Sequence, residues 1–320
     1  MSNEKEPAAP VEEDLPEQLR IRREKRAGLI ERGIEPYPVA VARTASLLEI
    51  RTKYSSLETD TATGDIQSLT GRVIFKRDTG KLCFATLREG DGTELQAMLS
   101  LDKVGEEVLN SWKSDIDLGD IVSVTGEIIT SKRGELSILA NSYAMAAKSL
   151  RPLPNDHKPM SEETRVRMRY VDLVVNPQVK EVFMKRTKLF TAMRTFFNEA
   201  GYMEVETPVL QSIPGGAAAR PFITHHNSLD IPLYMRIANE LYLKRLIVGG
   251  FDGVYEFSKN FRNEGMDRTH NPEFTAMEIY VAYKDYNWMM EMTENLLEYC
   301  ATQVNGTTEA TFGEHKVNFK

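Results

Sequence analysis

The two halves of the chain differ in the spacing of their apolar residues. Apolar and polar positions alternate with a period of two over residues 66–77, 81–89, 93–100, 120–132 and 134–149. Such alternation predicts strands with one buried face, and the turn residues between the runs predict hairpins. A helical stretch near 102–113 separates the third strand from the fourth. Residues 64–150 are therefore expected to form a small antiparallel barrel.

Helical spacing replaces this pattern after the linker-like residues 151–154. Residues 160–175 begin a helical stretch, and a long helix is expected from Asn176 as its cap, through Pro177 at its start, to Gly201 at its end. Its apolar residues share one face, which should pack against another surface. They are Val179, Val182, Phe183, Phe190, Met193, Phe196 and Phe197.

Strands and helices then mix up to the last residue. A helix is expected at 240–250 and the start of a further hairpin at 305–320, with strands at 203–210, 221–227, 233–238, 253–264 and 273–283. Mostly antiparallel strands with helices predict an α+β second domain. The expected division is a barrel at 64–150, a linker and helix at 151–175, and the α+β domain at 176–320.

The residues before the barrel include two charged segments. Residues 1–14 are acidic and rich in Pro and Ala, which predicts a disordered tail. Residues 15–63 are expected to form a basic helix and its connection to the barrel. That helix is either a solvated face or a binding surface for phosphates, and its cations are Arg20, Arg22, Arg23, Lys25 and Arg26.

Composition narrows the class of protein. The 320 residues are 41% hydrophobic and 27% charged, which suits two folded cores. No apolar run of about 18 residues and no leader pattern occur, so a cytoplasmic protein without a membrane span is expected. Cys83 and Cys300 lack metal-ligand spacing, so neither a zinc site nor a disulfide framework is expected. The net charge of −7 disfavours general binding of nucleic acid but leaves room for a local basic surface.

Five strands with a helix between the third and fourth are the plan of an OB-fold. The exposed face of such barrels commonly binds single-stranded nucleic acid by stacking and polar contacts. Suitable residue types here are Phe75, Arg77, Phe84, Gln96 and Glu135. Taken alone, each of them is more often ordinary surface or core.

The most informative segment is residues 257–283, which predicts two strands around a polar loop. Because alternate residues of a strand share a face, Arg262 and Glu264 should point together, as should Phe274, Glu278 and Tyr280. Arg holds phosphate, Phe stacks on a base and Glu neutralises an ammonium group, so the face suits a nucleotide and an amino acid. The alternative is a polar hairpin with a surface ion pair.

These segments resemble the class II aminoacyl-tRNA synthetases. FRNEG (261–265) followed by HNPEFTAMEIY (270–280) is similar to motif 2 of that family, and GYMEVETPVL (201–210) after a long helix is similar to motif 1. Residues 214–227 and 238–256 are very similar to class II lysyl-tRNA synthetases. With the barrel, the resemblance extends from about residue 15 to the last residue.

The resemblance implies a reaction and the residues that perform it. The family makes lysyl-adenylate from L-lysine and ATP with Mg²⁺, then transfers lysine to tRNA(Lys). Arg262 is implied to contact the ATP α-phosphate and to stabilise the transition state as the catalytic residue. Further implied ATP contacts are Glu264, His270 and Asn271, with Phe274 stacking on adenine. The implied lysine site consists of Gly215 and Gly216, of Glu240 for the α-ammonium, and of Glu278 with Tyr280 for the side chain.

The resemblance also implies macromolecular partners. Phe84, Gln96 and Glu135 fall where related synthetases contact anticodon bases, and Arg77 is a plausible neighbour. The basic helix would meet tRNA phosphates in a salt-dependent manner. The helix and strand of motif 1 imply a homodimer.

One departure from the family is at the end of the sequence, where no third motif with its ATP-binding Arg is found. The family's metal ligands are expected beyond Lys320, with none within this chain, which predicts a fragment with little or no aminoacylation. The alternatives are a tRNA-binding fragment without activity, a synthetase for Asp or Asn, and the lysine-like paralogue that modifies elongation factor P. Glu278 argues against an acidic substrate, and the N-terminal barrel argues against the paralogue.

Overall fold

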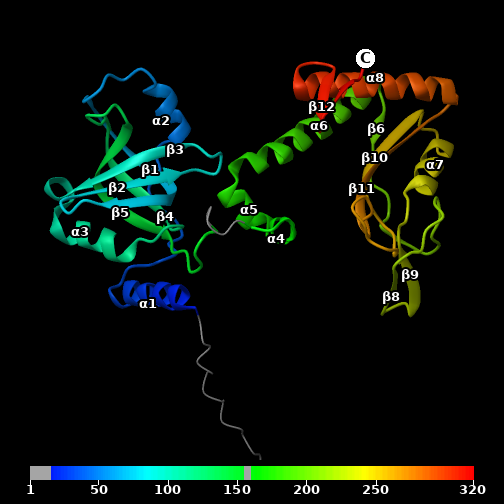
Figure 1. Ribbon diagram of the computed structural model, residues 1–320. Helices are drawn as coiled ribbons and strands as arrows, with labels where there is room; N and C mark the ends of the chain where they lie inside the picture. The colour runs from blue at the N-terminus through cyan, green and yellow to red at the C-terminus, as the bar shows by residue number, and fades with distance from the viewer. Residues whose placement is uncertain (1–15, 155–159) are drawn as a thin grey trace, which may run out of the picture. The chain divides into compact units, whose positions relative to one another are not determined.

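The computed structural model describes residues 16–154 and 160–320 (Figure 1). The chain forms two compact units, Met1–Lys180 and Glu181–Lys320. The linker and helix expected at 151–175 therefore belong to the barrel's unit. The tail predicted at 1–14 lies outside the described residues.

The first unit is built around a closed barrel in the order β1-β2-β3-β5-β4 (Figure 1). Its strands are β1 (Ala62–Asp78), β2 (Leu82–Arg88), β3 (Glu94–Ser100), β4 (Ile121–Thr130) and β5 (Leu136–Ala147). Neighbours are antiparallel except for β3 and β5, which pair in parallel. Helix α3 (Leu101–Asp115) connects the third strand to the fourth. The predicted barrel and its helix are confirmed.

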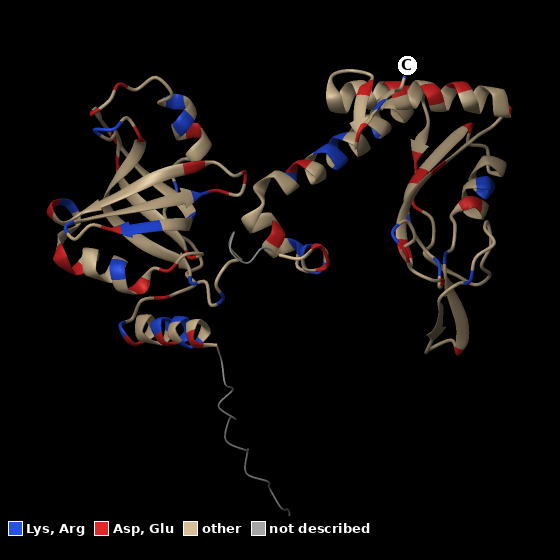
Figure 2. Cartoon of the chain, viewed as in Figure 1, with Lys and Arg blue, Asp and Glu red and all other residues tan. Residues whose placement is uncertain are grey.

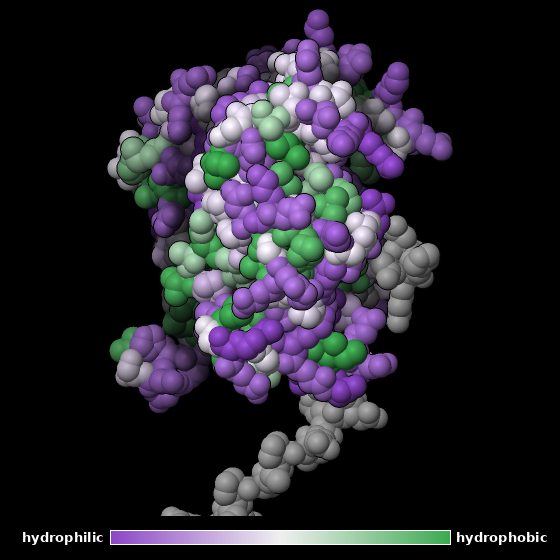
Figure 3. Space-filling view, turned by 90° about the vertical axis from the view of Figure 1, so that its left-hand side faces the viewer, coloured by the Kyte–Doolittle hydropathy of each residue, from purple (hydrophilic) through white to green (hydrophobic). Residues whose placement is uncertain are grey.

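Alternation along the strands sets the barrel core. In β2 and β3 every second residue is buried, including Leu87 and Leu99. Trp112 of α3 is fully buried and packs edge-on against Tyr143, with ring centroids 4.9 Å apart. Burial of each large apolar side chain contributes about 1.5–3 kcal/mol. On the face seen in Figure 3, apolar side chains appear only in small groups between polar ones.

Four further helices belong to this unit. They are α1 (Glu17–Glu31), α2 (Leu47–Lys53), α4 (Glu162–Arg167) and α5 (Arg169–Val175). The basic helix and the stretch beginning at 160 are confirmed, whereas α2 was not predicted. Its signal was the capping box in which Ser46 and Glu49 bond each other's backbone amides.

The long helix differs from its prediction at both its start and its packing. A single 3-10 turn, η1 (Pro177–Val179), precedes α6 (Lys180–Glu199). Asn176 does not cap it, because its side-chain amide donates to Asp172 Oδ1 at 2.8 Å. Only the later part of the apolar face packs in the core, around Phe197, whereas Val182 and Phe183 are 67% and 46% exposed.

The second unit contains three small sheets, ordered β11-β10-β6, β7-β9-β8 and β12-β13. The strands are β6 (Met203–Glu204), β7 (Leu210–Gln211), β8 (Ile223–His226), β9 (Ile231–Met235), β10 (Gly253–Phe261), β11 (Glu273–Val281), β12 (Glu309–Phe312) and β13 (His315–Asn318). All pairs are antiparallel except β10 with β6. The predicted α+β class and the terminal hairpin are confirmed.

The prediction of a single strand at 203–210 is wrong. Only its two ends pair as β6 and β7, because the backbone amide and hydroxyl of Thr207 bond to the buried Glu256 carboxylate instead of to a strand. Pro208 has no amide hydrogen to donate.

Two helices complete this unit, α7 (Glu240–Val248) and α8 (Tyr286–Asn305). Helix α7 was predicted and α8 was not, although Asp285 caps its start and Gly306 ends it in the left-handed conformation. Within residues 16–154 and 160–320, no helix is long and apolar enough to cross a membrane.

Candidate functional site

The β10–β11 hairpin sets the geometry of the candidate site in the second unit. Its antiparallel register places Glu256 opposite Glu278 and Val254 opposite Tyr280. Residues on β10 are mostly buried, whereas those on β11 are half-buried. The hairpin therefore pairs a buried strand, β10, with a half-buried strand, β11, at the edge of the sheet.

Arg262 and Phe274 lie together at the loop end of the hairpin. The Arg262 guanidinium carbon is 5.0 Å from the centroid of the Phe274 ring. The backbone amide of Arg262 donates to Pro272 O at 2.8 Å. The side chain also donates to Ile237 O at 3.4 Å. A half-buried guanidinium beside an aromatic face suits a phosphate joined to a stacked base.

The polar loop after Arg262 is held by its own side chains. The Glu264 carboxylate accepts from the backbone amide of Arg220 at 3.3 Å, which ties the loop to the segment before β8. His270 Nδ1 lies 2.8 Å from Asp267 Oδ2. The Thr269 backbone amide and the His270 side chain hold the pKa of Asp267 well below its usual range. Asn271 is exposed at the end of this loop.

Gly215 and Gly216 lie against the first turn of α7. A Cβ at Gly216 would be 3.0 Å from Glu240 Cβ and 3.1 Å from Ala238 Cβ, and its φ of +89° also favours glycine. A Cβ at Gly215 would be 2.6 Å from Leu241 Cδ1. The absence of side chains at these two positions therefore lets this segment pack closely against the start of α7.

Two carboxylates, Glu278 and Glu240, lie near Tyr280, and Glu256 lies close to Glu278. The Tyr280 hydroxyl donates to Glu278 Oε2 at 3.2 Å. Burial raises the pKa of Glu278, and the nearby carboxylates Glu240 and Glu256 raise it further. Burial and the charges of Glu278 and Glu240 likewise raise the pKa of Tyr280. Such a group of acids suits a cationic ligand.

A buried ion pair that the sequence did not reveal supports this site. Arg236 Nη1 is 2.7 Å from Glu256 Oε1, and both side chains are at most 5% exposed. Asn239 Nδ2 donates to the other Glu256 oxygen at 3.0 Å, while its own Oδ1 is buried and has no partner. The sequence offered only a weak signal for this pair. Glu256 falls at an inward position of a strand, and a buried carboxylate there needs a buried cation.

The barrel brings together the residues predicted to read bases. Arg77 stacks over the Phe84 ring at 4.9 Å, and the Gln96 side chain accepts from Ser137 Oγ at 3.0 Å. Arg51 Nη2, which was not predicted, lies 3.1 Å from Glu135 Oε1. Phe84 and Gln96 occupy half-exposed positions of adjacent strands. Together they form an exposed face with an aromatic ring and amide and carboxylate groups.

Helix α1 carries several Lys and Arg residues (Figure 2), and part of this charge binds residues of its own unit. Arg22 is buried and donates to Ser149 O and Leu118 O, both at 2.9 Å. It therefore anchors the helix, and its predicted contact with phosphates is corrected. Lys25 pairs with Asp117 at 2.6 Å, and Arg26 lies over the Tyr37 ring at 5.7 Å.

The two remaining cations of the helix, Arg20 and Arg23, are exposed. Arg20 pairs with Glu24 of the same helix at 2.6 Å.

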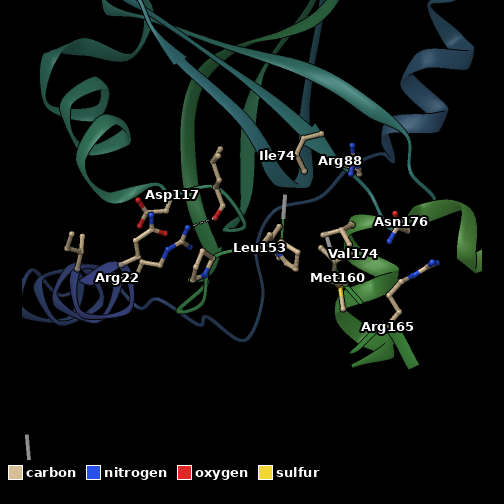
Figure 4. A pocket seen from close by; sticks show the side chains of 15 residues that line it. Arg22, Ile74, Arg88, Asp117, Leu153, Met160, Arg165, Val174 and Asn176 are labelled. Carbon is tan, nitrogen blue, oxygen red and sulfur yellow. Dashed lines mark hydrogen bonds between the residues drawn. The ribbon is translucent and has the colours of Figure 1, made fainter. Parts of the chain in front are cut away.

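A cleft of about 830 Å³ lies within the first unit, between α1, the barrel and the α4–α5 segment (Figure 4). Its arginines are already paired: Arg22 with two carbonyls, Arg88 with Glu94 and Arg165 with Asp172. None of the predicted lysine or ATP residues lines it. We assign it no ligand.

These features define the class of protein. A closed barrel with an aromatic ring and amide and carboxylate groups on one face is followed by an antiparallel hairpin that places Arg262 over Phe274 on the same unit as a group of carboxylates. Residues 67–146 match the OB-fold nucleic acid binding domain, and residues 161–320 match the tRNA synthetases class II (D, K and N). The chain belongs to this class II synthetase family.

Its named relatives are lysine–tRNA ligases. The chain is 58% identical over 302 residues to lysine–tRNA ligase 1 of Mycobacterium tuberculosis, covering 94% of this chain and 60% of that protein. It is 55% identical over 322 residues to the lysine–tRNA ligase of Christiangramia forsetii, covering 96% and 55%. The chain thus spans 55 to 60% of the length of these relatives.

Proposed function

We propose that this chain carries the anticodon-binding barrel and the first part of the catalytic domain of a lysine–tRNA ligase. The observation that carries the proposal is the placement of Glu278 and Glu240 beside Tyr280, with Glu240 against Gly216 and with Arg262 in the loop of the same hairpin. The acidic character of this group of residues fits an amino acid with two ammonium groups better than it fits aspartate or asparagine. The names of the relatives support the same substrate.

In the proposed reaction the lysine carboxylate attacks the α-phosphorus of ATP, and pyrophosphate leaves. Arg262 would donate to the α-phosphate and stabilise the charge that develops there, while Phe274 holds the adenine. Glu264, His270 and Asn271 would make further contacts with ATP. Glu240 would bind the α-ammonium, and Glu278 with Tyr280 the side-chain ammonium.

Magnesium would enter this reaction together with ATP. In the part of the chain that the structure describes, no three or more His, Cys, Asp or Glu side chains are grouped so that they could hold a metal. We therefore assign no protein ligand to Mg²⁺.

We propose that the barrel binds the anticodon of tRNA(Lys). Phe84 would stack on a base, Gln96 and Glu135 would bond base edges, and Arg77 would support the stack. The exposed Arg20 and Arg23, with the partly engaged Lys25 and Arg26, would contact phosphates. This arrangement lets an acidic chain bind tRNA through a local basic surface.

We also propose a homodimer through α6 and the segment that follows it. Val182, Phe183 and Met184 near the start of α6 are exposed apolar side chains, which a partner copy could cover. Sedimentation of the chain would show a dimer, and Phe183→Asp would shift it to monomer. A cytoplasmic location belongs to the same proposal.

The test is lysine-dependent ATP–pyrophosphate exchange, with tRNA(Lys) binding measured at two salt concentrations. Little or no activity is expected of this chain, so exchange that needs lysine, is lost in Arg262→Ala and persists in Arg245→Ala would show that the part of the catalytic domain present here suffices for activation. Exchange driven by aspartate or asparagine would contradict the lysine assignment. Salt-sensitive tRNA binding without exchange would support only the role of a tRNA-binding fragment.

A further inference from the structure

A side chain of the protein's own occupies part of the acidic site. Lys244 Nζ, on the second turn of α7, lies 2.5 Å from Glu240 Oε1. The same ammonium lies 5.9 Å from the centroid of the Tyr280 ring. Glu240 and Tyr280 are both residues to which the proposed function assigns the substrate lysine.

The placement is more than an ordinary pair on a helix surface. Tyr280 belongs to β11 rather than to α7, and its hydroxyl bonds to Glu278 of the same site. The carboxylate partner Glu240 is also the α7 residue that Gly216 approaches most closely. The next cation of the helix, Arg245, instead stacks on Tyr242 at 4.6 Å. Of these two cations, Lys244 is directed at the site and Arg245 is not.

The chemistry of the two ligands is the same. A lysine side chain ends in a primary ammonium, and the substrate carries two such groups, so Lys244 and the substrate offer the same kind of partner to the Glu240 carboxylate. The side chains of Lys244 and Glu240 are 56% and 29% exposed, so the pair opens at modest cost.

We infer that Lys244 is a tethered competitor of the substrate, whose ammonium holds Glu240 until lysine displaces it. This inference rests on the proposed function. The apparent association constant for lysine is then the intrinsic constant multiplied by the fraction of molecules in which Glu240 is free. Lys244 also keeps the acidic site neutralised between substrates, so that other cations bind it less readily.

The experiment is calorimetric titration of the chain with L-lysine, in the wild type and in Lys244→Met, Lys244→Arg and Arg245→Met. We expect Lys244→Met to bind lysine about two- to fivefold more tightly, the range that corresponds to an exposed ion pair of this kind. Lys244→Arg keeps a competing cation and should match the wild type. Arg245→Met removes the same charge from the same helix and should also leave the affinity unchanged.

Equal or weaker binding by Lys244→Met would overturn the inference, because it would mean that Lys244 is neutral or that it orients Glu240 for the substrate. An equal gain in Arg245→Met would also overturn it, since the effect would then be general charge. Absence of lysine binding in all four chains would contradict the proposed lysine site itself, and the competitor with it.

Discussion

At the scale of single residues, burial decides which charged groups matter for stability. The Arg236–Glu256 pair is almost fully buried at 2.7 Å, whereas Lys259 and Glu273 of the same hairpin are 3.7 Å apart and more than half exposed. Removing one member of a buried pair leaves the other charge without compensation, which costs about 3–5 kcal/mol. Exposed pairs contribute at most about 1 kcal/mol.

We therefore expect Arg236→Ala to lower the free energy of unfolding of the second unit by about 3–5 kcal/mol. Lys259→Ala should change it by less than about 0.5 kcal/mol. Urea denaturation followed by aromatic fluorescence measures both. Losses of similar size in the two variants would show that burial of the pair does not set its contribution.

Glu278 gives a pH dependence at the same scale. Its pKa in the folded chain is raised above the usual 4.5 by burial and by two carboxylates. The folded state therefore binds this proton more tightly than the unfolded state, and stability is lost as pH rises through the folded pKa. Glu278→Gln carries no charge, so it should be more stable than the wild type near neutral pH. Denaturation across pH should show this advantage shrinking as pH falls through the folded pKa toward 4.5 and levelling off below it, and a constant difference across this range would contradict it.

At the scale of elements, docking of α1 depends on one buried arginine. Arg22 satisfies two carbonyl groups of the barrel unit, whereas its neighbour Arg23 is exposed. We expect Arg22→Ala to speed hydrogen exchange across α1, because Leu118 O and Ser149 O lose their donor. Arg23→Ala should leave the exchange unchanged but lower the salt slope of tRNA binding by about one. Unchanged exchange in Arg22→Ala would show that the ion pairs of Lys25 and Arg32 suffice to dock the helix.

At the scale of the whole molecule, the two units have separate cores. The barrel core contains aliphatic residues that include Leu69, Val124 and Ile138, and the second core is dominated by aromatics such as Phe197 and Tyr255. Separate cores predict two unfolding transitions that respond to different substitutions.

Gly126→Ala tests this prediction in the barrel. A Cβ at Gly126 would lie 2.1 Å from Leu139 O, where β4 meets β5. Such a clash costs about 1–3 kcal/mol. Calorimetry should show Gly126→Ala lowering only the barrel transition, while Arg236→Ala lowers only the other. A single transition that shifts in both variants would mean that the units unfold together.

The sequence by itself determined the barrel and the α+β class of the second unit, and it predicted the candidate site residues. Alternation and turn residues are local properties, so they are visible in neighbouring letters, and the Arg262 motif is a contiguous string. Tertiary structure alone decided that Arg22 is an anchor, that the segment after α6 pairs only at its ends, and that Lys244 reaches Glu240 beside Tyr280. Each of these depends on burial or on contact between residues far apart in the chain. Only the folded backbone fixes those distances, because they arise from the packing of elements rather than from the preferences of single residues.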